Sequence, residues 1–253
     1  MQVTTPSVGD RSFQFGDGLF STIKVTDGRP ELWALHQSRL QQGVERLGIK
    51  APDWQQLAIL VQQAVTAESQ VIKIVISRGH AGRGYSPVGV DGPDIYISTA
   101  ALPDYQLWQQ QGIRLDVAKL QLACQPVLAG LKHNNRLEQV LLKQELAATE
   151  WDDLLVLDQL GYITEATAAN VFFYSQQQWF TPQLQRAGVA GVMRAHLMAQ
   201  LAVTEVNWTL PELEQVGAMF LCNALCGVVP VRQLQQRSLD ISVVQQLQQE
   251  LVC

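Results

Sequence analysis

A short segment with proline and glycine, CQPVLAG at residues 124–130, most constrains the fold of this chain of 253 residues. The two sides of this segment are built differently. The first reads as a hairpin, two helices and two strands, and the second as a helix followed by closely spaced strands. Proline and glycine interrupt regular structure and are typical of linkers. We therefore expect two domains, at residues 1–122 and 131–253, joined by a linker at residues 123–130.

The first half carries clear local signals. FSTIKVTDGRPELW (residues 20–33) predicts a hairpin that turns at Asp27-Gly28, because this dipeptide is typical of tight hairpin turns. Helical spacing of apolar residues predicts helices at residues 35–47 and 52–67. VIKIVISRG (71–79) and DIYISTA (94–100) predict paired strands with a glycine-rich loop between them, and RLDVAKLQLA (114–123) ends this half.

The second half is expected to begin with a helix, HNNRLEQVLLKQELAATE at residues 133–150. Strands follow at DDLLVLD (152–158), GYITEA (161–166) and NVFFYS (170–175), and a helix at 192–201 comes before short strands and helices. The predicted fold class is therefore α+β. The chain is therefore expected to have two α+β domains.

Composition and charge exclude several classes of function. The formal net charge of −5 argues against a nucleic-acid or anionic-membrane partner. No apolar run approaches the roughly 20 residues that cross a bilayer. The N-terminus has neither the basic start nor the apolar core of a signal peptide, so we expect a cytoplasmic protein with reduced thiols. Cys222 and Cys226 are four residues apart, but the histidines are scattered singly, so we expect buried thiols and no metal site.

One of the six lysines, Lys132, has an unusual position in the sequence. It follows a glycine-containing loop and stands at the start of the helix predicted at 133–150. The positive end of the helix dipole disfavours an ammonium there, and partial burial would lower the lysine pKa further. An amine that is neutral near pH 7 can form a Schiff base with an aldehyde cofactor. A structural lysine at a helix start is the alternative, and Lys132 alone does not decide between them.

A carboxylate and an arginine supply further parts of such a site. Glu165, in GYITEATAANVFF, has small neighbours that leave room for a flat ring, whose pyridine nitrogen an acid would keep protonated. Arg39 lies three residues after His36 on one predicted helix, and a guanidinium is a good phosphate donor.

Two backbone corners add donors for a phosphate. Val192 and Met193 open a helix after the loop RAGVAG, and Asn223 and Ala224 follow a predicted strand. Backbone N–H groups at a helix start bind anions well.

Five motifs occur in the order and spacing of one enzyme family: HQSRL, AGLKHNNRLEQ, ITEATAANVF, AGVAGVMR and LCNAL. From about Phe13 to Val231 the chain resembles the fold-type IV pyridoxal phosphate enzymes of the class IV aminotransferase family. These include branched-chain aminotransferases, D-amino acid aminotransferases and 4-amino-4-deoxychorismate lyases. The resemblance implies their two-domain fold, with a small N-terminal α/β domain and a larger C-terminal domain that contains a mixed sheet or barrel. It also implies pyridoxal 5′-phosphate as cofactor and a homodimer. It also implies the site residues: Lys132 as the Schiff-base lysine, Glu165 on the pyridine nitrogen, and Arg39, Val192, Met193, Asn223 and Ala224 around the phosphate.

Within this family the chain most resembles the lyases, in FQFGDGLFSTIKV, ISRGHAGRGYS, LVLDQLGYITEATAANVF and LCNALCGVVPV. The resemblance implies release of pyruvate from 4-amino-4-deoxychorismate to leave 4-aminobenzoate, a folate precursor, with Lys132 as general base and acid. It further implies that Thr22 assists protonation. Arg83, Tyr85 and Ser21 are expected to contact the substrate, Arg83 through a substrate carboxylate.

Three alternatives remain open at this stage. A transaminase would use the same Lys132 and Glu165 but return the amine to a keto acid. A nucleotide-binding protein could use GHAGRG as a phosphate loop, although the order of glycines differs from a dinucleotide fingerprint and no helix follows at once. A catalytically inactive relative could retain the fold, although the presence of Lys132, Glu165 and Arg39 together argues against it.

Overall fold

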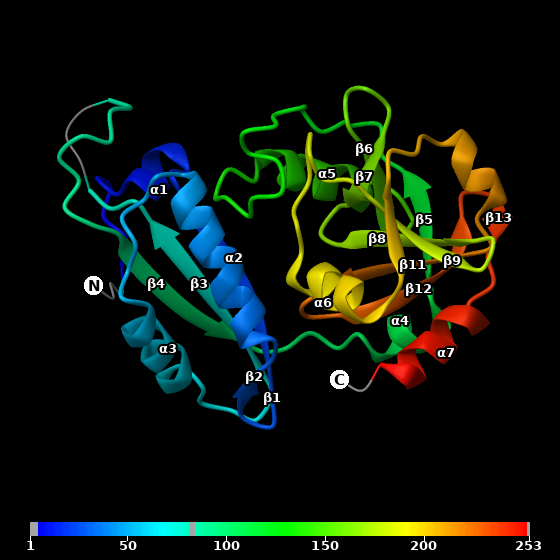
Figure 1. The fold of residues 1–253 in the computed structure, drawn as a ribbon, viewed down its shortest axis with the longest axis horizontal. Helices are drawn as coiled ribbons and strands as arrows, with labels where there is room; N and C mark the ends of the chain where they lie inside the picture. Colours follow the sequence, from blue (N-terminus) through cyan, green and yellow to red (C-terminus); the bar gives the residue numbers. More distant parts are fainter. Residues whose placement is uncertain (1–4, 81–83, 252–253) are drawn as a thin grey trace. The chain divides into compact units, whose positions relative to one another are not determined.

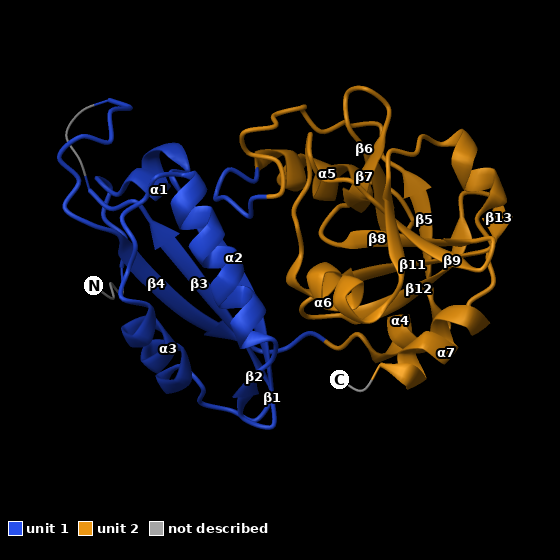
Figure 2. Cartoon of the chain, viewed as in Figure 1, with its two compact units in different colours: residues 1–103, 131–136 blue, residues 104–130, 137–253 orange. Residues whose placement is uncertain are grey.

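The computed structural model describes residues 5–80 and 84–251. Its contacts divide the chain into two compact units, shown in Figure 2. The first unit comprises residues 1–103 and 131–136, and the second comprises residues 104–130 and 137–253. We predicted domains at residues 1–122 and 131–253 with a linker at 123–130. In the structure, the chain passes between the two units after residues 103, 130 and 136 instead.

The first unit is built on an antiparallel sheet of order β2-β1-β3-β4, drawn in Figure 1. Its strands are β1 (Gly18–Thr26), β2 (Arg29–Pro30), β3 (Gln70–Ser77) and β4 (Asp94–Ala100). The predicted hairpin is confirmed: β1 pairs with β2 across Asp27 and Gly28, whose φ angles of 51° and 69° are the positive values that such a turn requires. The predicted pairing of the 71–79 and 94–100 segments is also confirmed, as β3 and β4.

Helices cover one face of this sheet. They are α2 (Trp33–Arg46) and α3 (Trp54–Gln63), whereas the short helix α1 (Arg11–Phe15) precedes β1 in the chain. The buried residues Leu40 of α2 and Leu57 of α3 share one apolar cluster with Leu19 and Ile23 of β1. Along β1, residues of this cluster alternate with partly exposed residues, so Phe20 and Thr22 lie on the face that α2 does not cover.

The second unit has a nine-stranded mixed sheet with β10-β9-β8-β11-β12-β5-β6-β7 as its path and β13 beside β12. The pairs β5–β6, β5–β12 and β9–β10 are parallel, and the remaining pairs are antiparallel. The strands are β5 (Ile113–Val117), β6 (Asp153–Leu157), β7 (Ile163–Ala166), β8 (Asn170–Ser175), β9 (Gln178–Pro182), β10 (Val203–Val206), β11 (Ala218–Asn223), β12 (Gly227–Leu234) and β13 (Arg237–Ser238). This composition confirms the predicted α+β class.

The helices of the second unit are α4 (Gln106–Gln111), α5 (Leu137–Ala147), α6 (Val192–Gln200), the 3₁₀ helix η1 (Pro211–Gln215) and α7 (Ser242–Glu250). The core is rich in aromatic rings, with Phe172 stacked on Phe220 at 4.7 Å between centroids. Cys222 and Cys226 are buried thiols, as predicted. None of the helices within residues 5–80 and 84–251 is long and apolar enough to cross a membrane.

Two segments differ from the expectation for physical reasons. Residues 113–117 form β5, which pairs with β12 and β6, so this strand belongs to the sheet of the second unit. Its partner β12 lies more than a hundred residues away in the sequence, and periodicity does not reveal such pairing. The helix predicted at 133–150 begins only at Leu137, because residues 132–134 pair with the start of β1 instead.

Candidate active site

Lys132 lies in an extended segment along the start of β1. Its carbonyl oxygen accepts a hydrogen bond from the backbone N–H of Phe20 at 2.9 Å, and Asn134 N–H donates to the carbonyl of Gly18 at 3.0 Å. Since α5 begins five residues after Lys132, the predicted position at a helix start is wrong, and the helix dipole does not act on this amine as we expected. The backbone of Lys132 is instead fixed by β1.

The ammonium of Lys132 lies over an aromatic ring. Its Nζ is 4.6 Å from the centroid of Phe20, and Nζ of Lys73 is 4.9 Å from the same centroid. Lys73 is the register partner of Thr22, so Phe20, Thr22 and Lys73 lie on the same face of the sheet. In the sequence, Lys73 has the pattern of an ordinary outward-facing charge on a strand. Lys73 alternates with the buried Ile72 and Ile74, so the sequence predicts that it faces outward. The sequence alone does not show that Lys73 lies near Lys132.

Ser21 points to the opposite face of β1, toward α2, and is completely buried. Its hydroxyl lies 2.7 Å from Nδ1 of His36 and accepts a hydrogen bond from Nη2 of Arg39 at 2.5 Å. Because a guanidinium only donates, the serine proton is available for Nδ1 of a neutral His36. This role differs from the substrate contact that we predicted, because strand alternation turns Ser21 toward the helix.

Arg39 and His36 are both affected by burial. Burial, followed by the positive charges of Arg39 and Lys132, lowers the pKa of His36 to about 3, so this imidazole is neutral at physiological pH. Burial lowers the pKa of Arg39 to about 10, which leaves the guanidinium charged. Nε of Arg39 is buried and has no hydrogen-bond partner among residues 5–80 and 84–251. A buried donor without an acceptor fits a site for an anion.

In the second unit, Glu165 belongs to β7 and is only 5% exposed. Its Oε2 accepts a hydrogen bond from the backbone N–H of Val189 at 2.9 Å. The segment of Val189 approaches closely because Gly188 has no side chain: a Cβ atom there would lie 2.6 Å from Cγ2 of Thr164 and 3.3 Å from Oε2 of Glu165. Glycine is therefore required for the contact that orients this carboxylate.

The N-terminus of α6 is a donor corner of the second unit. Gly191 occupies the N-cap position and has no side chain that could accept a hydrogen bond. The N–H groups of Val192 and Met193 in the first turn are therefore not capped by the N-cap residue. Asn170 fixes the entry to the helix, because its Oδ1 accepts from Gly191 N–H at 3.1 Å and its Nδ2 donates to the carbonyl of Val189 at 2.8 Å. An uncapped helix of this kind is suited to bind a phosphate.

Asn223 ends β11 and forms a turn with Ala224. Its Oδ1 accepts hydrogen bonds from Leu225 and Cys226 N–H at 2.8 and 2.9 Å, and its Nδ2 donates to the carbonyl of Ala168 at 3.3 Å. The Asn223 side chain thus stabilises the turn, which leaves the backbone of Ala224 as the part that can serve a ligand.

The predicted substrate residues of the glycine-rich loop are only partly observed. Arg83 lies outside the described residues. Tyr85 is 83% exposed, and its ring contacts that of Phe15 at 5.2 Å between centroids.

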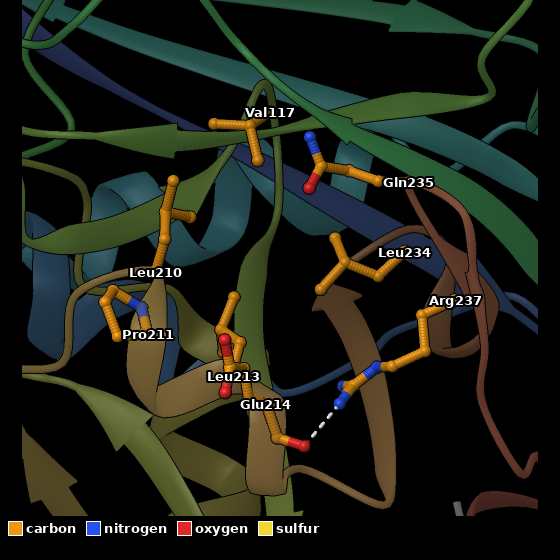
Figure 3. Close-up of a pocket in the computed structure, with 8 residues that line it drawn as sticks. All are labelled: Val117, Leu210, Pro211, Leu213, Glu214, Leu234, Gln235 and Arg237. Carbon is orange, nitrogen blue, oxygen red and sulfur yellow. Dashed lines mark hydrogen bonds between the residues drawn. The ribbon is translucent and has the colours of Figure 1, made fainter.

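A hollow of about 360 Å³ in the second unit, shown in Figure 3, contains none of the predicted residues. Leu213 and Leu234 of the apolar core form part of its wall. Arg237 at its side donates to the carbonyls of Glu214 at 2.7 Å and Val216 at 3.0 Å, so its guanidinium stabilises the backbone around η1. This hollow is therefore not the candidate site.

Comparisons with known proteins point to one family. Residues 18–234 match the family model of class IV aminotransferases. A curated aminodeoxychorismate lyase from Vibrio harveyi is 44% identical over 231 residues, which cover 88% of this chain and 85% of that protein.

Solved structures agree with this match. The crystal structure of 4-amino-4-deoxychorismate lyase from Pseudomonas aeruginosa is 35% identical, with a TM-score of 0.93 over 98% of this chain and 95% of that chain. Branched-chain amino acid aminotransferase from Escherichia coli, at 19% identity, has a TM-score of 0.86 over 97% and 88% of the two chains and shows the fold alone. The predicted fold-type IV architecture is thereby confirmed.

Proposed function

Since this chain belongs to the class IV aminotransferase family, we propose that it is a lyase that uses pyridoxal phosphate to convert 4-amino-4-deoxychorismate to 4-aminobenzoate and pyruvate. The observation that carries this proposal is the 44% identity to the Vibrio harveyi lyase over 88% of the chain. The Pseudomonas aeruginosa lyase supports it through the fold. A transaminase of the same family is the second candidate, because the curated relatives at about 25% identity include aminotransferases.

We propose that the following residues of the chain hold the cofactor. Lys132 is its proposed covalent anchor, and Glu165 the partner of its pyridine nitrogen. Its phosphate is assigned to Arg39, to the N–H groups of Val192 and Met193, and to Asn223 and Ala224. Three observations support this fit: the unpartnered buried Nε of Arg39, the uncapped start of α6 and the turn at Ala224. The cofactor, when bound, supplies an electron sink for the carbon that carries the substrate amine.

The chain itself moves the protons. Lys132, when its amine is free, is the proposed base for the proton on that carbon, and it can return a proton at Nζ. Thr22 is proposed to assist protonation through its hydroxyl, which lies on the same face of β1 as Phe20. Ser21 lies on the other face, where its hydroxyl accepts a hydrogen bond from Arg39, and it is proposed to hold this arginine in place for the phosphate.

Substrate binding is assigned to positive and polar groups. Arg83 is proposed to form a bidentate pair with a substrate carboxylate, together with Tyr85. Lys73 adds a positive charge next to Phe20 and Lys132, which suits an anionic substrate. We further propose that the enzyme is a cytoplasmic homodimer that supplies 4-aminobenzoate for folate synthesis, without nucleic-acid or membrane partners.

Two measurements test the function. The purified protein is expected to show the visible absorption band of bound pyridoxal phosphate. Borohydride should abolish this band and attach the cofactor permanently to Lys132. It should also release pyruvate and 4-aminobenzoate from 4-amino-4-deoxychorismate in the absence of any amino acceptor. Lys132→Ala should lose both the covalent link and turnover. Loss of the substrate amine that requires a keto acid as acceptor, without release of pyruvate, would favour the transaminase. A protein that takes up no pyridoxal phosphate would refute the proposal.

A further inference from the structure

The guanidinium of Arg11 donates hydrogen bonds to three consecutive backbone carbonyls of the glycine-rich loop. Arg11 is 4% exposed; its Nη1 donates to the carbonyls of Gly84 at 3.3 Å and Ser86 at 3.1 Å, and its Nη2 donates to that of Tyr85 at 2.7 Å. Three carbonyl dipoles that converge on one point repel one another unless a cation lies between them. The path of residues 84–86 therefore depends on this arginine.

A further donor of Arg11, its Nε, fixes the guanidinium itself. Nε donates to Oδ2 of Asp17 at 2.8 Å, and the same carboxylate accepts from Nε of Arg78 at 2.8 Å. Burial raises the pKa of Asp17, but hydrogen bonds from Arg78 and Arg11 outweigh it and lower the pKa. Asp17 is therefore an anion that holds two arginines, and Arg11 is the one that bonds to the described loop residues 84–86. The other, Arg78, donates to the carbonyls of Leu47 and Gly48 at 2.7 Å.

The same N-terminal segment fixes the other end of the loop. Arg11 N–H donates to the carbonyl of Gly79 at 3.0 Å, and Asp10 bridges to His80. Asp10 in turn accepts hydrogen bonds from Ser77 at 2.9 Å and Tyr96 at 2.7 Å, on the two strands that the loop connects.

Aromatic packing connects Arg11 to the side chain of Tyr85. The guanidinium lies 5.2 Å from the centroid of the Phe15 ring, and that ring contacts Tyr85. Both the backbone and the ring of Tyr85 thus rest on α1.

We propose that Arg11 is a positioning residue for substrate binding: it sets the backbone of residues 84–86 and, with Phe15, the orientation of Tyr85. This proposal rests on the proposed function, in which Tyr85 contacts the substrate. Lysine cannot replace Arg11, because an ammonium lacks the planar fork that serves Asp17 and the carbonyls at once.

The test compares Arg11→Lys with Arg78→Lys in the full-length enzyme loaded with pyridoxal phosphate. Both variants weaken the bond to Asp17, but only the first removes the bonds to residues 84–86. For Arg11→Lys we expect KM for 4-amino-4-deoxychorismate to rise about tenfold or more, with kcat reduced much less and the cofactor spectrum unchanged. For Arg78→Lys we expect KM close to the wild-type value. Equal KM changes in the two variants, or none in Arg11→Lys, would overturn the proposal.

Amide hydrogen exchange separates this outcome from a failure of the proposed function. The peptide that contains residues 84–86 should exchange faster in Arg11→Lys than in Arg78→Lys, whichever reaction the enzyme catalyses. Unchanged exchange in this peptide would contradict the role of Arg11 directly. If Arg11→Lys folds poorly, Phe15→Leu tests the same proposal, because it removes the ring under Tyr85 and leaves the guanidinium bonds intact. A smaller KM rise is expected there, and an unchanged KM would count against the proposal.

Discussion

Nη2 of Arg39 donates to the hydroxyl of Ser21 at 2.5 Å, so a strand residue holds the guanidinium of a residue on α2. The neighbouring Thr22 lies on the opposite face of β1, beside Phe20. We therefore propose different roles for these two adjacent hydroxyl residues. Ser21 supports the binding of the cofactor phosphate, and Thr22 assists proton transfer. Single substitutions can separate these tasks.

Ser21→Ala is expected to weaken cofactor binding. The substitution leaves a buried donor of Arg39 and Nδ1 of His36 without their shared partner, which costs about 1–3 kcal/mol. Part of this cost should appear as an affinity for pyridoxal phosphate lowered about tenfold, measured by titration of the apoenzyme at its visible band. An unchanged affinity would show that Ser21 does not position Arg39.

Thr22→Ala is expected to show the opposite pattern and serves as the matched variant. Its hydroxyl contributes to no contact with Arg39, so cofactor affinity should equal that of the wild type. The kcat for pyruvate release should fall by about 10²-fold if the hydroxyl assists proton transfer. A kcat that stays within twofold of the wild-type value would remove Thr22 from the proposed mechanism.

The buried His36 predicts a dependence of stability on pH. Its pKa of about 3 lies below the ordinary value of 6.5, so below pH 6.5 the unfolded chain binds a proton that the folded chain does not. The stability associated with neutral His36 is therefore present above pH 6.5 and is lost as pH falls toward 3, by at most about 1.4 kcal/mol per pH unit.

Urea unfolding at pH 7, 6 and 5 measures this effect. His36→Asn keeps a polar atom near Nδ1 but cannot titrate, so its unfolding free energy should be lower at pH 7 and fall less steeply than that of the wild type. His133, whose pKa burial lowers to about 4, retains a contribution of the same sign in both proteins. Equal slopes in the two proteins would exclude His36 as a source.

Local patterns were sufficient for part of the fold, and non-local pairing accounts for what they missed. The Asp27-Gly28 turn and the 94–100 strand depend on a few neighbouring residues, and both were predicted. By contrast, β5 belongs to the second sheet because it pairs with β12. The segment at 132–134 pairs with β1, and this pairing overrides the helical pattern that was expected to begin at residue 133.

Some features of the candidate site also follow from local sequence patterns, whereas others depend on contacts between distant residues. The start of α6 followed from the sequence, because a glycine-rich loop precedes a helical pattern. The inward orientation of Ser21 is also contained in the sequence, since Leu19, Ser21 and Ile23 occupy alternate positions of β1, and it differs from the expected substrate contact. The roles of Lys73 and Arg11 could not be predicted, because each depends on residues brought close only by folding: Phe20 for Lys73, and residues 84–86 for Arg11.

The last prediction concerns Gly188, which allows the Val189 backbone to reach Glu165. Gly188→Ala imposes two costs: an unfavourable positive φ of 82°, and a Cβ atom 2.6 Å from Thr164 and 3.3 Å from Oε2 of Glu165. Gly161→Ala is the matched control, because Gly161 has a φ of 84° and no atom within 4 Å of the added Cβ. The control should therefore lose only the backbone term, about 1 kcal/mol of unfolding free energy. Gly188→Ala should lose about 2–3 kcal/mol more, since a crowded interior resists an added methyl group. Only Gly188→Ala should also lower the affinity for pyridoxal phosphate, because the displaced segment no longer orients Glu165. Equal losses of stability and cofactor affinity in the two variants would show that the close approach at Gly188 does not serve the carboxylate.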